Sequence, residues 1–311
     1  MVGTENTATS SSSAPTCTDM CSILDVDPVA RVVTHLPSGR STSVGPRDSG
    51  AAALGLWLYA VVHAGNPALM TTQGAQTDQE LIGALVESSG GSRIAVDLDS
   101  TGWDELHGVR LTLTDQDRVE NNPDQVLIPC TRPFLTPGFV MYVHDSGDYD
   151  QMLQGVRLYI GLKEPRVAQN VWSRIVEKLD AEGISYRCKI LAQRSSYPRT
   201  DSVVCYLARR ADEAIDIIKG ILGSLSPEDV VATSPMCAPL APGLTMARNV
   251  IDPRVRQEVS FGQHRCALLA EAIMRRLDDG EDFAQAFRDT CVEANADPDD
   301  LSRNLLIPEQ R

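Results

Sequence analysis

The chain has 311 residues, of which 42% are hydrophobic and 23% charged, and its net charge is −14. This composition is typical of a globular protein and excludes a largely disordered one, and the acidic balance argues against generic nucleic-acid binding. The longest apolar run, Leu54 to Val62, is about half a membrane span, and the Ser- and Thr-rich start lacks the basic and apolar parts of a signal peptide. Eight scattered cysteines predict a cytoplasmic protein with reduced, mostly buried thiols and no disulfide framework.

The first half of the chain predicts mixed helices and strands after a disordered tail. Helices are expected at residues 50–65, where Gly65 would be the stop, and at 76–87, where Thr77–Asp78–Gln79–Glu80 resembles a cap. Strands are expected at residues 93–98, 108–114 and 138–144. Residues 115–136 contain several prolines and read as loop.

The second half gives a sharper pattern. Val156 to Leu162 alternates as a strand does, and Pro165 opens a helix whose apolar residues recur every four positions. Two more strands and a helix follow, at residues 184–191, 203–208 and 212–222, and the chain closes with helices at 266–277 and 282–294. This strand–helix–strand–strand–helix order predicts an α+β fold with a mixed or antiparallel sheet, packed by N-terminal and C-terminal helices.

We expect four regions along the chain. They are a disordered tail (1–20), an N-terminal helical and strand region (21–150), a basic core with C-terminal helices (151–296) and a polar tail (297–311).

Positive charge is concentrated in one part of this acidic chain. Between Arg157 and Arg210 there are eleven Lys and Arg against five Asp and Glu, a net charge of +6, so the remainder carries −20. Such a segment suggests a local anionic ligand such as a phosphate, although pairing with acidic neighbours elsewhere in the fold would explain it equally well.

Strand periodicity groups several polar side chains of this segment. Side chains repeat every two residues, so Arg157 and Tyr159 share one side of their strand, and Arg187 and Lys189 share one side of the next. Paired strands could bring Arg157, Lys189 and Tyr206 together. Arginine suits bidentate phosphate recognition, and a lysine among other cations is a usable base because its neutral form is favoured. The alternative is an ordinary solvated sheet face.

One rival motif points to a different chemistry. Residues 94–101 read as a strand that ends in DxDxT, with Asp97 and Asp99 placed as in Mg²⁺-dependent phosphatases of the haloacid-dehalogenase type. Those enzymes have the motif near the start of a long parallel α/β run, which this sequence lacks. A strand that runs into an acidic turn is the simpler interpretation, and the five histidines form no metal-binding pattern.

The order of several segments resembles the HopA-type effector-like proteins, namely the separate lyases that accompany an aminoglycoside-phosphotransferase-like kinase in class V lanthipeptide and thioamitide biosynthesis. The likeness covers roughly residues 50–295 and is weak over 66–126. It rests on the segments LYAVVHAG (58–65), LTPGF (135–139), VRLYIGL (156–162), YRCKIL (186–191), YPRTD (197–201), VVCYLA (203–208), APGLTMA (241–247) and SFGQHRCALLAEAI (260–273).

The resemblance implies a phosphoserine/phosphothreonine lyase. A partner kinase, acting separately or in a complex with this chain, would phosphorylate Ser or Thr of a ribosomal precursor peptide. This chain would then remove the phosphate by β-elimination to leave dehydroalanine or dehydrobutyrine. No cofactor, metal, nucleic acid or membrane is expected. The reaction needs a base for the Cα proton, cations for the phosphate and a donor for the developing enolate.

Residue chemistry on the matching segments suggests a set of roles. Lys189 would be the base, Tyr206 the donor with support from Tyr159, and either His264 or His144 the acid. Asp201 would orient Arg199. The expected phosphate ligands are Arg157, Arg199, Arg265 and Arg194.

Two other functions stay open from the sequence. A non-catalytic module that binds a phosphopeptide or a kinase would use the same basic segment but would not need Lys189 for turnover. A Mg²⁺-dependent phosphatase would need Asp97 and would be sensitive to EDTA.

Overall fold

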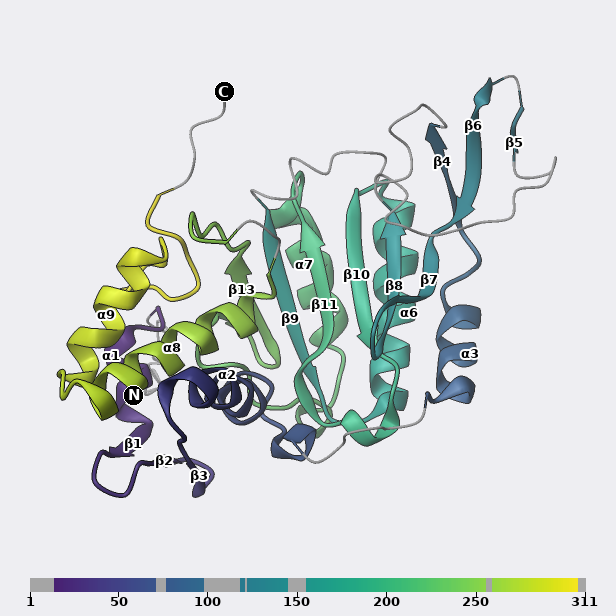
Figure 1. The fold of residues 1–311 in the computed structure, drawn as a ribbon. Helices are drawn as coiled ribbons and strands as arrows, with labels where there is room; N and C mark the ends of the chain where they lie inside the picture. Colours follow the sequence, from purple (N-terminus) through teal and green to yellow (C-terminus); the bar gives the residue numbers. More distant parts are fainter. Residues whose placement is uncertain are drawn as a thin grey trace, which may run out of the picture.

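The computed structural model describes residues 14–70, 77–97, 118–120, 122–144, 155–255 and 259–306. Within them the fold is α+β, as the sequence predicts (Figure 1). The predicted strand at residues 108–114 and most of the N-terminal tail lie outside the described residues.

A seven-stranded sheet of antiparallel neighbours forms the centre of the molecule. Its strand order is β12-β13-β9-β11-β10-β8-β7. The strands are β7 (Thr131–Thr136), β8 (Phe139–His144), β9 (Val156–Leu162), β10 (Tyr186–Leu191), β11 (Arg199–Leu207), β12 (Ala238–Ala241) and β13 (Leu244–Arg248). All seven residues of β9 are buried, so this strand is covered on both faces.

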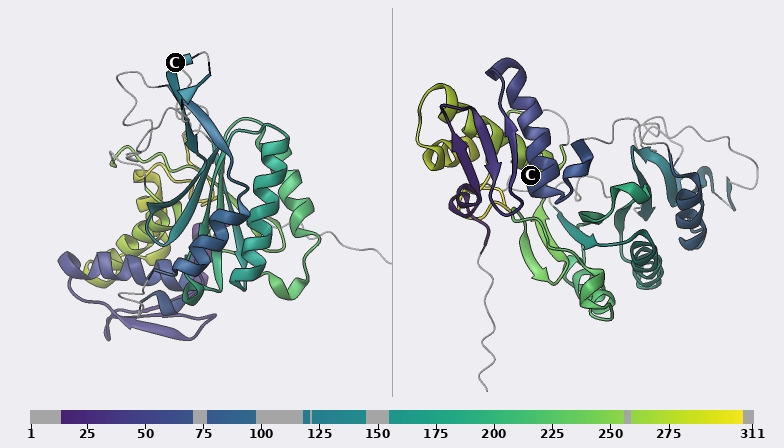
Figure 2. Two further views of the ribbon diagram at one scale, coloured as in Figure 1. Left: turned by 90° about the vertical axis from the view of Figure 1, so that its right-hand side faces the viewer. Right: turned by 90° about the horizontal axis from the view of Figure 1, so that it is seen from below.

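Helices α6 (Pro165–Ala181) and α7 (Ala211–Leu222) cover one face of the sheet, as Figure 2 shows from two sides. The apolar residues spaced four apart on α6 are buried against Leu158, Ile160 and other even-numbered residues of β9. This confirms the predicted order β9-α6-β10-β11-α7. Gly183 ends the α6 turn with φ of 62°, a conformation that suits glycine.

A second helical layer covers the β13 end of the other face (Figures 1 and 2). It comprises α1 (Cys17–Ser22), α2 (Arg47–Leu58), α8 (Phe261–Asp278) and α9 (Phe283–Glu293). Tyr159, Val204 and Ala247 of the sheet are buried in the same apolar cluster as these helices. The predicted helix over 50–65 is present as α2 followed by a π-helical turn, η1 (Tyr59–His63), and Gly65 follows with φ of 64°.

The remaining elements are small. Three-stranded antiparallel sheets are formed by β1 (Leu24–Asp27), β2 (Val32–His35) and β3 (Arg40–Ser43), and by β4 (Arg93–Asp97), β6 (Asn122–Pro129) and β5 (Arg118–Val119). The short helices are η2 (Pro67–Met70), α3 (Gln79–Ser88), η4 (Arg194–Ser196) and η5 (Pro227–Asp229). The Asp78 side chain caps α3, which confirms that predicted helix start.

The prediction of loop over 115–136 is wrong, because β6 and β7 occupy most of it. Proline is tolerated at strand ends and on edge strands, where no ladder hydrogen bond is lost. Pro129 ends β6, and Pro133 lies on β7, one of the two edge strands of the central sheet.

Both predicted tails are too long. A capping box at Thr16 and Asp19 starts α1, and Cys17 and Met20 are buried in the helical layer, so a disordered tail cannot extend to residue 20. Near the other end Leu301 is buried, and its N–H donates to the carbonyl of Pro15 over 2.7 Å. The boundary expected near residue 150 stays a prediction.

All eight cysteines are free thiols and seven of them are buried, in line with the sequence prediction. Among the described residues, no helix combines the length and the apolar character that crossing a membrane requires.

Candidate functional site

The candidate site lies on the sheet face opposite α6 and α7, at the centre of the sheet. Arg157 on β9 is the Cα partner of Tyr206 on β11, and Tyr206 is the partner of Arg187 on β10. Lys189 lies one side-chain repeat further along β10, opposite Val204. The structure therefore brings Arg157, Tyr206 and Lys189 to one face, as the strand periodicity predicts.

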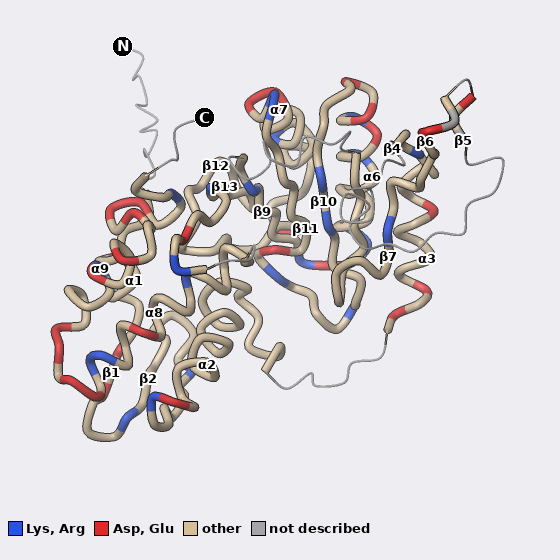
Figure 3. Tube along the Cα trace, turned by 45° about the horizontal axis from the view of Figure 1, so that its top comes forward, with Lys and Arg blue, Asp and Glu red and all other residues tan. Residues whose placement is uncertain are grey.

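Cations and aromatic rings alternate across this face. The Lys189 Nζ lies 4.5 Å from the ring centroid of Phe139 and 5.9 Å from that of Tyr206. The Arg157 Cζ lies 5.2 Å from the Tyr206 ring, and the Arg199 Cζ lies 5.7 Å from the Phe139 ring. These distances are in the range of cation–π contacts. We call these five residues the cation–aromatic row, and in Figure 3 the basic segments of β9, β10 and β11 lie in the same region of the molecule.

Arg199 is held by a buried carboxylate. Its Nε and Nη2 donate to the two oxygens of Asp201, each over 2.7 Å, and Nη2 also donates to the Tyr59 hydroxyl over 3.0 Å. That hydroxyl in turn donates to Asp201 over 2.9 Å. Burial alone would raise the pKa of Asp201, but the charge and hydrogen bonds of Arg199 hold it at about 2. The expected Arg199–Asp201 contact is present. It occupies Nε and Nη2 of the guanidinium, the pair of donors that could otherwise bind a phosphate.

Tyr59 and His63, from the π-helical turn, are neighbours of this ion pair that the sequence reasoning did not single out. The His63 Nδ1 lies 2.9 Å from the Ser234 Oγ, and the ring contacts Tyr159 edge-on at 5.3 Å. A side chain at Gly262 would overlap this ring, so glycine there lets α8 pack on His63. Both residues lie in the LYAVVHAG segment, and a π-turn is itself frequent at functional sites.

Burial makes His63 a neutral side chain. Desolvation lowers the pKa of His63 to about 4, and the charges of Arg199 and Lys189 act in the same direction while Asp201 opposes them. A histidine with a depressed pKa stabilises the fold above its ordinary value of 6.5, and this stability is lost as the pH falls toward 4.

We therefore expect the free energy of unfolding to fall by roughly 3 kcal/mol on account of His63 between pH 7 and pH 4. Chemical denaturation across this range measures the loss, and the ring ¹³C shifts of His63 report its titration. A midpoint near pH 6.5 for His63 would contradict the buried, neutral side chain.

Arg157 is the most enclosed cation of the row, at 3% exposed. Its Nε donates to the Asn249 Oδ1 over 2.5 Å and its Nη1 to the Val259 carbonyl over 3.3 Å. Tyr159 lies on the same face but is buried beneath His63 and Phe261, and burial raises its pKa well above the ordinary value. Tyr206 is only partly buried, so it suits a donor role better than Tyr159 does.

Two expected roles at the start of α8 do not fit. Arg265 is completely buried, and it donates to the carbonyls of Leu301 and Arg303 and to the Nδ1 of His264. The other nitrogen of His264 lies 2.8 Å from Asp252, and burial lowers the pKa of His264 to about 4. Arg265 is thus bonded to two backbone carbonyls and to His264, and both ring nitrogens of His264 are engaged, so neither side chain is presented as the expected phosphate ligand or acid would be.

Two further expected residues lie away from the row. His144 is the Cα partner of Tyr186, so it belongs to the opposite sheet face, and its Nδ1 lies 3.1 Å from the Ile184 carbonyl. Arg194 lies in η4, about half exposed, and pairs with Asp78 and Glu80 near the start of α3. Neither side chain reaches the face that carries Lys189.

Two cavities adjoin the site. A mainly apolar groove of about 590 Å³ runs between α2 and α8 and has Tyr59 in its lining. A second cavity of about 410 Å³ is lined by Arg199 and Thr200 together with the end of η1. Tyr59 and Arg199, which are hydrogen-bonded to each other, thus line different cavities.

A metal centre has little support in the described part of the chain, where no group of three His, Cys, Asp or Glu side chains could hold an ion. Asp99 of the phosphatase-like motif lies outside the described residues. The strand that precedes it, β4, pairs antiparallel with β6 in a small separate sheet, which differs from the parallel arrangement that the motif requires.

Comparisons with known proteins show the family of the chain. The profile of the HopA1 effector protein family matches residues 130–303, which is more than half of the chain. A comparison with curated proteins gave no match.

Two solved structures of Pseudomonas syringae effector proteins are similar to it. One, from pathovar tomato strain DC3000, is 15% identical with a TM-score of 0.44, and the other, from pathovar syringae strain 61, is 17% identical with a TM-score of 0.45. Each match covers 75% of this chain and 83% of the effector. From the profile match, the chain belongs to the HopA1 effector protein family.

Proposed function

We propose that this chain is a lyase that eliminates phosphate from phosphorylated Ser or Thr side chains of a ribosomal precursor peptide, giving dehydroalanine or dehydrobutyrine. The observation that carries the proposal is that Lys189, Arg157 and Tyr206 lie on one sheet face, with the Lys189 amine and the Arg157 guanidinium both close to the Tyr206 ring. An amine, a guanidinium and a phenol match the base, the phosphate ligand and the enolate donor that elimination requires.

The reaction would proceed on this face without a cofactor. The Lys189 amine takes the Cα proton, the C–H electron pair becomes the Cα=Cβ double bond, and the Cβ–O bond breaks with its electron pair leaving on phosphate. Tyr206 donates a hydrogen bond to the substrate carbonyl as negative charge develops on its oxygen. Protonated Lys189 then returns its proton to the departing phosphate, which restores the base and removes the need for His264 or His144 as acid.

The arginines would have separate roles in this reaction. Arg157 would bind the phosphate, and Arg187, the Cα partner of Tyr206 on β10, would add positive charge on the same face. Arg199 would fix Tyr59 and Asp201 beside the row, because its guanidinium is already engaged with both. The rest of the chain carries a net charge of −20 and would repel a phosphopeptide. Electrostatic attraction of the substrate must therefore come from the basic residues near the site.

The proposal implies a partner. An aminoglycoside-phosphotransferase-like kinase in the same cytoplasm would supply the phosphorylated peptide, either in solution or within a complex. Incubating the chain with its precursor peptide, with and without the kinase and ATP, tests this by peptide mass. Loss of water only when both proteins are present supports the lyase, whereas a peptide that stays phosphorylated contradicts it and points to a binding module.

Tyr206→Phe should lower kcat by about 10²-fold, the loss typical of one oxyanion donor, while the KM for a phosphopeptide changes little. The phenyl ring keeps the contacts with Arg157 and Lys189, so the variant removes only the hydroxyl. Tyr206→Ala is the matched comparison and should also raise KM, because the ring that packs against Arg157 is gone. Steady-state kinetics of phosphate release separate the two, and a fully active Tyr206→Phe would exclude the donor role.

A further inference from the structure

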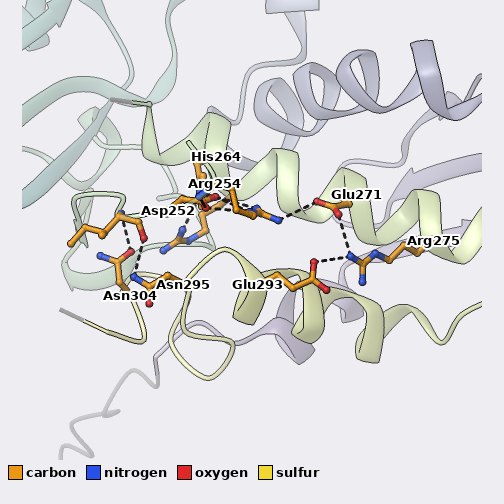
Figure 4. A network of polar contacts seen from close by, with 10 residues as sticks. Asp252, Arg254, His264, Glu271, Arg275, Glu293, Asn295 and Asn304 are labelled. Carbon is orange, nitrogen blue, oxygen red and sulfur yellow. Dashed lines mark hydrogen bonds and ion pairs between the residues drawn. The ribbon is translucent and has the colours of Figure 1, made fainter. Parts of the chain in front are cut away.

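A polar network links the start of α8 to the segment that precedes it (Figure 4). Its centre is Asp252, whose side chain is 1% exposed. The carboxylate accepts hydrogen bonds from the Arg254 side chain over 3.1 to 3.3 Å and lies 2.8 Å from the His264 Nε2.

The contacts of His264 define its tautomer. The Arg265 guanidinium can only donate, and its Nη1 lies 2.7 Å from the His264 Nδ1, so Nδ1 is the acceptor. The proton of the neutral ring is then on Nε2, which donates to Asp252. Arg265 itself is anchored by the carbonyls of Leu301 and Arg303. Asp252 is thus held in a fixed position relative to α8 and the C-terminal segment.

Two described residues that lie before and after Asp252 in the sequence hold Arg157. Asn249, three residues before Asp252, accepts from the Arg157 Nε, and the Val259 carbonyl accepts from its Nη1. The Asn249 carbonyl is fixed in turn by the Asn304 side chain over 2.8 Å. The orientation of the Arg157 guanidinium therefore depends on where Asn249 and Val259 lie, and Asp252 is the buried carboxylate that lies between them in the sequence.

We propose that Asp252 is a positioning residue that acts through Asn249 and Val259 to aim Arg157 at the phosphate of the substrate. The identity of the ligand as a phosphate rests on the proposed lyase function. The coupling between Asp252 and Arg157 does not depend on that function. An arginine on a flexible side chain contributes fully to phosphate binding only when its fork is oriented in advance, and a displacement of about 1 Å can cost up to 10²-fold.

Asp252→Asn keeps the size of the side chain and removes the charge that Arg254 binds. We expect it to raise the KM for a synthetic phosphothreonine peptide about tenfold or more while kcat stays within about twofold. In an Arg157→Lys background the same substitution should change KM no further, because the group that it positions is gone. An equal rise in KM in both backgrounds would overturn the proposal.

Two controls separate positioning from general damage and from failure of the proposed function. Arg275→Gln removes contacts with Glu271 and Glu293 further along the same network and should leave KM unchanged. The Nε–H resonance of Arg157, identified by its loss in Arg157→Lys, should shift and exchange faster in Asp252→Asn even if the wild-type protein eliminates no phosphate. An unchanged resonance would refute the coupling, and a shifted resonance in a protein that eliminates no phosphate would refute only the lyase.

Discussion

Replacing Lys189 by Met should lower kcat for phosphate elimination by about 10²–10⁴-fold and leave the binding of a phosphopeptide nearly intact. The Lys189 Nζ lies between the rings of Phe139 and Tyr206, on the face that also carries Arg157. Methionine keeps an unbranched apolar side chain against these rings and removes only the amine. The expected loss is that of a general base, because nothing else in the row replaces it in the proposed reaction.

Arg187→Met is the matched comparison for Lys189→Met. Arg187 lies on the same strand and the same face, two residues away, so its loss removes a positive charge without removing the base. We expect a raised KM and a kcat close to that of the wild type. Single-turnover kinetics with a synthetic phosphopeptide, together with a direct binding measurement, give both quantities. Full elimination activity in Lys189→Met would contradict the assignment of the base.

The second large effect concerns stability rather than turnover. Asp201→Asn should lower the free energy of unfolding by about 3–5 kcal/mol, because it leaves the buried guanidinium of Arg199 without its counter-charge. Arg199 and Asp201 are 7% and 3% exposed, so solvent offers little compensation. Chemical denaturation at pH 7 measures the loss. Glu213→Gln breaks an exposed pair with Arg210 and should produce no measurable change.

The same ion pair predicts a dependence on pH. The folded-state pKa of Asp201 is about 2 and its ordinary value is 3.8, so the pair stabilises the fold above pH 4 and this stability is lost as the pH falls toward 2. The contribution is on the order of 2 kcal/mol. It should be absent in Asp201→Asn, and an identical acid profile for the two proteins would show that Asp201 is not held as a buried carboxylate.

Local periodicity was enough to predict the part of the fold that carries the site. The alternation on β9 and β10 and the recurrence of apolar residues every four positions on α6 are properties of single elements. They hold in the structure because alternate residues of a strand, and residues four apart on a helix, share one face. Arg157, Lys189 and Tyr206 could be placed on a common face for the same reason. Residues 115–136 were misread because proline is informative only once it is known whether a strand lies at the edge of a sheet.

The errors within the site have a tertiary cause. The sequence predicts a phosphate ligand at Arg265 and an acid at His264, but tertiary contacts engage both side chains internally, His264 with Asp252 and Arg265 with His264 and the carbonyls of Leu301 and Arg303. His63 was missed because its sequence context reads as the end of a buried helix, and only packing brings it beside Asp201, 138 positions later in the chain. Neither arrangement follows from spacing along the chain.

The most direct test of the lyase uses a synthetic phosphothreonine peptide that carries deuterium at Cα, incubated with the purified chain in EDTA. The proposal predicts release of inorganic phosphate together with loss of the deuterium and formation of dehydrobutyrine, all visible in the peptide mass. Release of phosphate with the deuterium retained and threonine regenerated would indicate hydrolysis. Either that result, or a peptide that is bound but never altered, would contradict elimination at the Lys189 face.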